Sequence, residues 1–583
     1  MTFSPPQSDI LFALTAQAGF DRLIACGAFP DCDLDLVRAV LAAAGDFAQD
    51  VLAPLNRPGD VAGARLENGE VRAAPGFAEA LQSYGQGGWS GLAASPEHGG
   101  QGLPRAVEQA ANEMMHAANM AFGLCPMLTL GAIEAIAAHA SPDLQAIYLP
   151  PMVAGAWTGA MNLTESAAGS DLAAVRTTAT PTPDGAYRLN GQKIFITWGD
   201  HDAAENIVHL VLARIPGAPE GVKGISLFLA PKFIPTPQGG IGERNGVRVA
   251  GLEHKLGIHA SPTCVMAFED ALAWRVGEEN RGLAHMFTMM NAARLGVGVQ
   301  GVAIAERAYQ QAFSFAQERR QGRPVLAAQG DGPIADHPDV RVNLLVMKAK
   351  IEAARALCLL TAVEGDLAHA APNAADRETA RLRQDFLVPI AKAWSTDRGV
   401  EIASLALQIH GGMGFIEETG AAQHYRDARI APIYEGTNGI QAIDLIGRKL
   451  GQANGEAAKS LLAEAGDIAK ALASHPDPRL QAAAPFLTSA LSSAVQATHW
   501  IEAAKLRSLP DALTGATAYL TLMGETLGGA LIAKGALAVL ASETDPAQRD
   551  ARIRSLTVYA AHVLAKTPGL RAAIELGALA LGA

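Results

Sequence analysis

The sequence predicts an α+β protein that is mainly helical, with a β domain between two helical regions and an additional helical domain at the C-terminus. Apolar residues recur three and four positions apart from about residue 33 to 149. Short runs of β-branched and aromatic residues follow from residue 158, and the helical spacing returns at residue 282. Because 583 residues are too many for one hydrophobic core, we expect four parts, at residues 1–157, 158–281, 282–450 and 451–583.

The first helical region contains two amphipathic segments, "LDLVRAVLAAAGDFAQDVLAPL" and "AVEQAANEMMHAANMAF", separated by a glycine-rich loop at residues 87–104. The β region contains the runs "KIFITW", "NIVHLVLARI", "GISLFLAPKFI" and "CVMAFEDALAWRV", bounded by turn-forming segments such as "PTPQGGIGERNG". No helical stretch separates these runs. They therefore predict an antiparallel sandwich or barrel of about a hundred residues.

The second helical region is interrupted at "GDGPIADHPDV" and "AAPNAADRET". After "GQANGE" the chain continues with four Ala- and Leu-rich helical segments, interrupted at "HPDPRL", "SLPD" and "ETDPAQ". The apolar faces of these segments suit packing against the rest of the protein. One interpretation of this C-terminal part is an oligomerisation or lid module.

The composition is that of an ordinary globular protein. The chain is 49% hydrophobic and 18% charged, and its net charge of −12 argues against a nucleic-acid-binding surface. The five cysteines are scattered, without a CxxC pair, which suits reduced thiols in a cytosol. The start "MTFSPPQSDILFALT" does not resemble a secretory signal, and no apolar stretch is expected to be long enough to span a membrane. We expect a cytoplasmic protein without a membrane-inserted segment.

The most obvious motif lacks the sequence context that its usual function requires. "GVGVQG", at residues 296–301, matches the dinucleotide pattern GxGxxG, but the residues on both sides have helical spacing instead of a preceding strand. Small residues at this spacing favour close packing of two helices. Neither a zinc-ligand spacing nor a GxSxG elbow occurs, so we expect no metal site and no hydrolase.

Three polar segments are candidates for ligand binding. "MNLTESAAGSDL" offers hydroxyls and accessible backbone N–H groups from Thr164, Gly169 and Ser170, although a surface turn is an equally good interpretation. "RRQGRP" matches either a favourable helix C-terminus or a phosphate-binding site. "QIHGGMGF" by itself indicates a helix cap.

A fourth segment, "PIYEGTNGIQ", places the acid Glu435 in a helix-breaking loop. One interpretation is a solvated acid in the first turn of the next helix, where the helix dipole favours negative charge. The other is a carboxylate presented to a substrate.

Six ordered segments resemble the acyl-CoA dehydrogenases over residues 89–450. They are "YLPPMVAGAWTGAMNLTESAAGSDL", "GQKIFITWG", "KLGIHASPT", "ERRQGRP", "QIHGGMGF" and "RDARIAPIYEGTNGIQ". The resemblance implies the family's fold: an N-terminal helical domain, a central antiparallel β domain and a C-terminal four-helix bundle. The N-terminal "FSPPQSDILFAL" and the helical block after residue 450 are similar to a larger subgroup of the family.

The resemblance implies FAD as the cofactor. Segments matching the family's flavin-contacting loop and strand supply Leu163, Thr164, Gly169, Ser170, Phe195 and Thr197, while Trp198 stands where the family often has Asn. Arg319 and Gln321 match residues that reach the FAD of a neighbouring subunit, which implies a homodimer or homotetramer. The remaining positions implied to contact FAD are Gln408 and Gly412 on its adenosine side, and Thr437.

The family's reaction removes two hydrogens from the α and β carbons of an acyl-CoA. The resemblance implies that Glu435 takes the α proton while the β hydrogen leaves as hydride to the flavin. The backbone N–H of Glu435 and a ribityl hydroxyl then stabilise the charge on the thioester oxygen. An ordinary glutamate, with a pKa of about 4.3, is too weak a base, so we expect its environment to raise the pKa. Residues implied to lie near the acyl group and CoA are Ser170, Asn291, Arg294, Tyr434 and Gly436.

Some relatives carry the base on another helix, beside the arginine that Arg294 matches. Here the neighbours are Ala292 and Ala293, so no competing acid exists. The leading interpretation is a dehydrogenase that passes electrons to an electron-transfer flavoprotein. An acyl-CoA oxidase that uses O₂, or a non-catalytic DNA-binding flavoprotein, is the alternative. The latter would need basic clusters in the last 130 or so residues, where the charges are of mixed sign.

Overall fold

The computed structural model describes residues 3–236, 239–327, 331–541 and 545–582. The chain divides into two compact units. One combines Met1–Gly45, Arg105–Ala117 and Arg294–Ala583, and we call it the helical unit; the other combines Asp46–Pro104 and Ala118–Ala293, and we call it the β unit. Both units draw on several separate stretches of chain, so the four predicted domain boundaries remain predictions.

The strands of the β unit form a closed ring. β11 pairs with β5, β5 with β4, β4 with β6, β6 with β7, and β7 again with β11. β10 extends the sheet beyond β11, and β3 extends it beyond β6. The strands are β3 Trp157–Asn162, β4 Thr178–Pro181, β5 Tyr187–Thr197, β6 Asn206–Arg214, β7 Ile225–Pro231, β8 Phe233–Pro235, β9 Ile241–Arg244, β10 Val247–Leu252 and β11 Thr263–Val276.

The ring is a barrel, but it is not wholly antiparallel as predicted. β3 pairs parallel with β6, and β4 makes one parallel bridge to β6. Alternation of apolar residues reports which face of a strand is buried and not the direction of its neighbour, so the sequence pattern could not show this. The core inside the sheet consists of apolar side chains such as Leu189, Ile207, Val211, Phe228 and Phe268.

Four helices and a hairpin complete the β unit: α4 Ala53–Ala62, α5 Phe77–Gln86, α7 Met120–His139, α8 Pro142–Val153, and the hairpin of β1 Arg65–Glu67 and β2 Glu70–Arg72. α7 packs against β3 and α8. The predicted continuous helix at residues 106–122 is broken at Asn119, whose side chain accepts a hydrogen bond from the Phe122 N–H at 3.1 Å and so caps α7.

The helical unit is built on three long helices: α9 Gly282–Glu318, which begins in the β unit, α10 Pro338–Ala370 and α11 Ala374–His410. The predicted packing role of "GVGVQG" is confirmed. A Cβ atom on Gly301 would lie 2.6 Å from the backbone of Ser395, and one on Gly298 would lie 2.9 Å from the Ala391 carbonyl oxygen. The glycines therefore allow α9 and α11 to approach closely.

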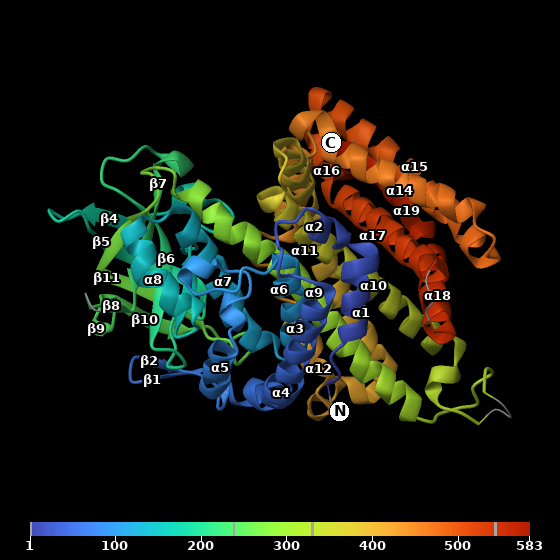
Figure 1. The fold of residues 1–583 in the computed structure, drawn as a ribbon, viewed down its shortest axis with the longest axis horizontal. Coiled ribbons are helices and arrows are strands. Elements are labelled where there is room, and N and C mark those ends of the chain that lie inside the picture. Colours follow the sequence, from blue (N-terminus) through green and yellow to red (C-terminus); the bar gives the residue numbers. More distant parts are fainter. Residues whose placement is uncertain (1–2, 237–238, 328–330, 542–544, 583) are drawn as a thin grey trace. The chain divides into compact units, whose positions relative to one another are not determined.

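The C-terminal part contains more helices than the four predicted. Its helices are α14 Glu456–Ser474, α15 Pro478–Arg507, α16 Leu509–Thr514, α17 Ala516–Ala541, α18 Pro546–His562 and α19 Thr567–Glu575. Four are long, and the additional breaks fall at Gly515 and at residues 563–566. Figure 1 shows this group in orange and red beside α10 and α11, with which it is in contact.

A small-residue ridge on α17 packs on Trp394 of α11. A Cβ on Gly524 would lie 2.5 Å from Trp394 Cγ, and one on Gly528 would lie 3.1 Å from Ala353 Cβ on α10. Trp394 is buried. Lys505 of α15 also donates to the backbone carbonyl of Ile446 at 2.7 Å. The C-terminal helices thus form part of the core of the helical unit.

Charged residues join the N-terminal helix α1 (Gln7–Phe12) to this unit. Asp9 accepts from Lys348 of α10 and from Arg552 of α18, each at 2.5 Å. Arg355 of α10 is fully buried and pairs with Glu113 of α6 (Arg105–Ala118) and Glu306 of α9. The remaining helices are α2 Asp21–Ala25, α3 Leu34–Phe47, α12 Ala421–Ala428 and α13 Asn438–Asp444.

The expectation that no apolar segment reaches membrane-spanning length is wrong. Among the described residues, the helices Met120–His139 and Ala516–Ala541 are long and apolar enough, although most of each is buried inside the protein. The second includes Lys534, whose ammonium group donates to the Gln17 carbonyl at 3.0 Å.

Candidate active site

Glu435 lies in the loop between α12 and α13 in an unfavourable backbone conformation. Its φ is +57°, and that of Gly436 is +84°. A side chain rarely adopts this left-handed region. α13 begins only at Asn438, and Thr437 caps it, because its hydroxyl accepts a hydrogen bond from the Ile440 N–H at 3.2 Å. Glu435 is half-buried, so a solvated acid in the first helical turn does not fit the structure.

Two side chains bind the carbonyl oxygens next to the carboxylate. Arg294 Nε donates to the Glu435 carbonyl at 3.4 Å, and Gln441 Nε2 donates to the carbonyls of Glu435 and Gly436 at 3.3 Å each. Arg294 is buried on α9, and its guanidinium also lies 3.8 Å from Asp444. The predicted substrate-side residues Arg294, Gly436 and Glu435 are therefore in one place.

A third contact reaches the loop from α11. The ammonium group of Lys392 donates to the Gly436 carbonyl at 2.9 Å and to Asn438 Oδ1 at 2.8 Å. The Asn438 amide in turn donates to Asp397 Oδ1 at 2.7 Å and to Thr396 Oγ1 at 3.0 Å. α11 thereby holds both the loop and the start of α13.

The environment of Glu435 makes it a stronger base than an ordinary glutamate. Burial raises the pKa of its carboxyl to about 7, although the positive charges of Arg294 and Lys392 act in the opposite direction. Desolvation of the carboxylate is therefore the dominant effect. A group with this pKa can exchange a proton near neutral pH, as a general base must.

The backbone N–H of Glu435 is free to bind a ligand, because no residue in the described part of the chain accepts its hydrogen bond. Next to it, the Tyr434 hydroxyl donates to Gln300 of α9, which is fully buried. Burial, followed by the nearby Glu435 charge, raises the pKa of Tyr434, so it stays neutral. A bonded core tyrosine and a wall of the acyl pocket are both compatible with this position.

The predicted flavin loop of the β unit is held by a buried ion pair. Lys193 of β5 donates to Glu165 at 2.8 Å and to the Leu163 carbonyl at 3.0 Å, and the Ile194 N–H donates to the Thr164 carbonyl at 2.9 Å. Burial lowers the pKa of Lys193 to about 8, against the effect of Glu165. Leu163 is buried and Thr164 half-buried, while Gly169 and Ser170 are exposed at the open end of the loop.

The end of β5 presents an aromatic ring to the surface. Phe195 has a φ of +60° and a side chain that is 59% exposed, while Thr197 is half-buried. Trp198, by contrast, is buried. Its ring stacks on Phe77 with centroids 6.3 Å apart, and its indole N–H donates to the Ala121 carbonyl at 3.2 Å. Trp198 is therefore a core residue of the β unit.

The predicted adenosine-side residues gather at one end of the helical unit. The rings of Phe315, near the end of α9, and His410, at the end of α11, stack with centroids 4.6 Å apart. This contact brings the exposed Arg319 and Gln321 near the exposed Gln408 and Gly412. Gly411 has a φ of +60° and ends α11, which confirms the predicted helix cap.

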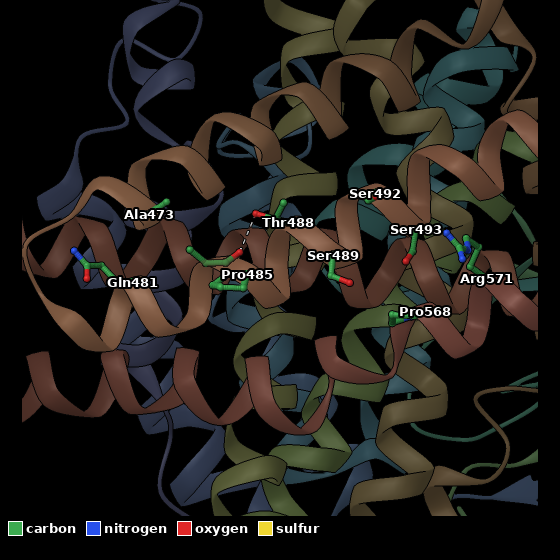
Figure 2. A pocket seen from close by; sticks show the side chains of 10 residues that line it. Ala473, Gln481, Pro485, Thr488, Ser489, Ser492, Ser493, Pro568 and Arg571 are labelled. Atoms are coloured by element: carbon green, nitrogen blue, oxygen red, sulfur yellow. Dashed lines mark hydrogen bonds between the residues drawn. The ribbon is translucent and has the colours of Figure 1, made fainter.

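A cavity on the surface of the C-terminal helices lies away from these residues. It has a volume of about 740 Å³ and runs along α15 toward α19 (Figure 2). Its one arginine, Arg571, already donates to Gln496 at 2.6 Å. No predicted site residue lines it. The lining residues are Ala473, Gln481, Ala484, Pro485, Thr488, Ser489, Ser492, Ser493, Pro568 and Arg571.

Comparison with known proteins decides the family. Models of the acyl-CoA dehydrogenase N-terminal, middle and C-terminal domains match residues 36–156, 160–271 and 280–451, and one described as acetyl-CoA dehydrogenase C-terminal like matches residues 461–583. The chain belongs to the acyl-CoA dehydrogenase family. Its activity is therefore the dehydrogenation of an acyl-CoA, with FAD as cofactor.

Two relatives of this acyl-CoA dehydrogenase extend over nearly its whole length. It is 46% identical to the 3-methylmercaptopropionyl-CoA dehydrogenase of Ruegeria pomeroyi, over 97% of this chain and 96% of the relative. It is 33% identical to the broad-specificity linear acyl-CoA dehydrogenase FadE5 of Mycobacterium tuberculosis, over 93% and 92% of the two chains. A Bacillus anthracis acyl-CoA dehydrogenase complexed with FAD has the same fold, with a TM-score of 0.75 at 21% identity over 93% and 88% of the chains.

The residues of this acyl-CoA dehydrogenase fit FAD. Phe195 is a large exposed ring, a surface that a flat aromatic group can cover. Gly169, Gly411 and Gly412 have no atom within 4 Å of the position of a Cβ, so open space lies in front of their backbones. Thr164 and Ser170 add hydroxyls of the kind that bind phosphate and ring oxygens.

Several residues that shape these sites were missed in the sequence. Lys392, Asn438, Gln441 and the Lys193–Glu165 pair hold the two loops in place. A signal existed for Lys392, because it is a single charge in the apolar helical run "FLVPIAKAW". A lysine there needs a partner, since a lysine is almost never fully buried unpaired.

Proposed function

We propose that Glu435 removes the α proton of an acyl-CoA bound by this protein. The observation that carries this proposal is the combination of a half-buried carboxylate, its pKa of about 7 and its adjacent N–H without an acceptor among the described residues. The carboxylate accepts the proton, and the N–H donates to the thioester oxygen on which negative charge develops.

The other residues of the loop orient the thioester. Gly436 keeps the backbone close to the thioester in a conformation where a Cβ would lie 2.6 Å from Gln441 Nε2, and Tyr434 lines the acyl side. Arg294 and Asn291 lie one helical turn apart on α9 and face the CoA side, together with Ser170 of the flavin loop. These roles rest on the family resemblance and on the contacts of Arg294 with the Glu435 carbonyl and Asp444.

FAD, when bound, supplies the acceptor for the hydride that leaves the β carbon. We assign its ring side to Leu163, Thr164, Gly169, Ser170, Phe195, Thr197 and Thr437. We assign Arg319 and Gln321 to the FAD of a neighbouring subunit, and Gln408 and Gly412 to the adenosine side of that FAD. The exposed phenylalanine and the open space before the glycines support these assignments.

The acyl group is proposed to be 3-methylmercaptopropionyl or another short or medium chain. The support is the 46% identity with the Ruegeria pomeroyi dehydrogenase of that substrate. The proposed metabolic setting is dimethylsulfoniopropionate demethylation or fatty acid β-oxidation. The test is an anaerobic titration with 3-methylmercaptopropionyl-CoA and straight-chain acyl-CoAs, following the bleaching of the flavin absorbance. Bleaching by long-chain acyl-CoAs, without bleaching by the short and medium ones, would contradict the proposed substrate class.

The base assignment is tested with Glu435→Gln, which keeps the size of the side chain and removes its basicity. We expect the variant to retain bound FAD, measured from its absorbance spectrum, and to lose flavin bleaching by acyl-CoA by a factor of roughly 10³ or more. Reduction of the flavin at the normal rate would refute Glu435 as the base.

The proposed electron acceptor is an electron-transfer flavoprotein. An acyl-CoA oxidase is the second candidate, and aerobic turnover distinguishes them. Rapid peroxide formation from the substrate-reduced enzyme in air would contradict the dehydrogenase assignment. A slow reaction with O₂, together with fast reduction of an added electron-transfer flavoprotein, is the expected result.

The proposed assembly is a homodimer or homotetramer in the cytoplasm. Arg294 lies on α9, and Arg319 directly follows the last residue of this helix, Glu318, which lies about 36 Å from Arg294 along the helix axis. Contacts at Arg319 and at the catalytic loop therefore suit two different FAD molecules, as in a site shared between subunits. Sedimentation of FAD-loaded protein tests this, and a monomer with full FAD content would contradict it.

A further inference from the structure

Lys392 is the one lysine whose side chain touches the catalytic loop among the described residues. It is fully buried on α11, and both of its acceptors, the Gly436 carbonyl and Asn438 Oδ1, belong to the residues that directly follow Glu435. Removing an ammonium group from water is unfavourable, so a fully buried lysine is normally found where its hydrogen bonds and charge interactions offset that cost.

We propose that Lys392 is a positioning residue for the reaction, which holds the backbone of Glu435 in its left-handed conformation and keeps the carboxylate ionised for proton removal. The inference rests on the proposed role of Glu435 as the base. It adds to that role a residue on another helix, which touches neither the substrate nor the reacting atoms.

The backbone geometry supports the first half of the proposal. The left-handed conformation of a non-glycine residue persists only where neighbouring groups enforce it. Lys392 of α11 binds the carbonyl of Gly436, and Gln441 of α13 binds the same carbonyl. The residue that follows Glu435 is thus held from both helices. Without the ammonium group, the remaining hydrogen bonds between α11 and this region of the described chain all involve Asn438, the first residue of α13.

The charges around the carboxylate support the second half. Lys392 and Arg294 are the two positive groups that act on Glu435. Arg294 is shared with Asp444, which also pairs with Arg448. Burial lowers the pKa of Lys392 to about 7, against the negative charges of Glu435 and Asp397, so the ammonium group and the carboxylate exchange protons in the same pH range. Tyr434 is neutral. Removing the charge of Lys392 therefore leaves Glu435 with one positive neighbour that is already shared.

A solely structural lysine is the alternative. In that case Lys392→Met would lower stability without changing the protonation of Glu435. Lys350 on α10 provides a matched control, because it is also buried, its pKa is also lowered by burial, and it pairs with Glu401 in the same unit. Within the described chain, its hydrogen bond is to Glu401 and not to the loop, so Lys350→Met reports the effect of losing a buried lysine in general.

The experiment measures the rate of anaerobic flavin reduction by an acyl-CoA between pH 5.5 and 9 for both variants. For Lys392→Met we expect a normal FAD spectrum, a reduction rate at least about 10-fold lower at pH 7, and an apparent pKa of the base raised by about one unit. Lys350→Met should show the apparent pKa of the unmodified protein. Lys392→Arg should restore the pKa, because the charge returns, but only part of the rate.

A second variant covers the case in which Lys392→Met does not fold. Lys392→Gln keeps a hydrogen-bond donor and removes only the charge, so it should shift the apparent pKa with a smaller loss of rate. Unshifted apparent pKa values in the folded variants would overturn the proposal. Glu435→Gln is measured in parallel: normal flavin reduction by that variant refutes the base itself, whereas its inactivity with an unshifted Lys392 variant refutes only the role of Lys392.

Discussion

Glu435 combines features that would be unfavourable at an ordinary position: a left-handed backbone, a desolvated carboxylate and an N–H without an acceptor among the described residues. Such features cost of order 1–3 kcal/mol each and persist where the surrounding structure enforces them. Here Arg294, Lys392 and Gln441 do so through hydrogen bonds to the two following carbonyls.

The pKa of Glu435 predicts how the reaction depends on pH. Only the ionised carboxylate can accept the α proton, and its pKa is raised to about 7. The rate of flavin reduction should therefore fall by about 10-fold for each pH unit well below 7 and level off above it. Rapid-mixing measurements between pH 5 and 9 test this. A flat profile across pH 5.5–8 would contradict a base with this pKa.

The same shift predicts a cost in stability. In the folded protein the pKa of Glu435 lies above its ordinary value of 4.5, so the folded state favours the protonated form. Its contribution to stability is present below pH 4.5 and is lost as the pH rises toward 7. Glu435→Gln should therefore raise the Tm at pH 8 by roughly 2–4 °C and leave it unchanged near pH 4.5. Thermal unfolding at both pH values tests this, and an equal increase at both would point to packing instead of charge.

At the scale of elements, α11 connects three parts of the helical unit. Its successive faces meet the glycines of α9, the catalytic loop through Lys392 and Thr396, and α17 through Trp394. A displacement of α11 would therefore reach the loop. Small residues on the facing helices set its position, because protein interiors cannot absorb extra atoms without moving.

Gly301→Ala tests this coupling. Its Cβ would lie 2.6 Å from the backbone of Ser395, which cannot move aside as a flexible side chain could. We expect a loss of about 1–3 kcal/mol in stability and a lower rate of flavin reduction, since Thr396 next to Ser395 contacts Asn438.

Gly466→Ala on α14 is the control for Gly301→Ala. No atom lies within 4 Å of its Cβ position, so this substitution should be neutral or stabilise the helix by up to about 1 kcal/mol. Tm values and rates for both variants are compared. A stable and fully active Gly301→Ala protein would show that α9 and α11 can separate without consequence.

The sequence predicted the order of the fold because helical and strand periods are local signals. It also pointed to Glu435, since an acid in a helix-breaking loop and the family motif are both contiguous. It did not predict the parallel pairing of β3 with β6 or the contact between Lys392 and Gly436. Those depend on residues 44 or more positions apart that only the fold brings together.

At the scale of the whole chain, the C-terminal helices do more than the predicted oligomerisation or lid role requires. They cover Trp394, approach α10 through Gly528 and bind the Ile446 carbonyl through Lys505. Partly buried charged residues extend this contact, since Arg552 of α18 pairs with both Asp9 and Glu352.

A chain that ends at Gly451 would leave Trp394 and the apolar face of α10 exposed. We expect it to be insoluble or to lack FAD, because an exposed apolar patch of this kind favours aggregation. Soluble yield and the flavin spectrum are the measurements. A control chain ending at Leu579, a residue that is 73% exposed, should behave normally. A soluble, FAD-loaded protein ending at Gly451 would show that the last helices form an independent module.

The glycine ridge of α17 also sets how substitutions on the two helices combine. A Cβ on Gly524 would lie 2.5 Å from Trp394 Cγ, and one on Gly528 would lie 3.4 Å from Trp394 Cη2, so both glycines face the same indole ring. A larger residue at Gly524 collides with the ring, and a smaller residue at position 394 leaves a void beneath α17. The two sides are therefore energetically coupled: a substitution on one side that destabilises the protein alone is compensated by a matching change on the other.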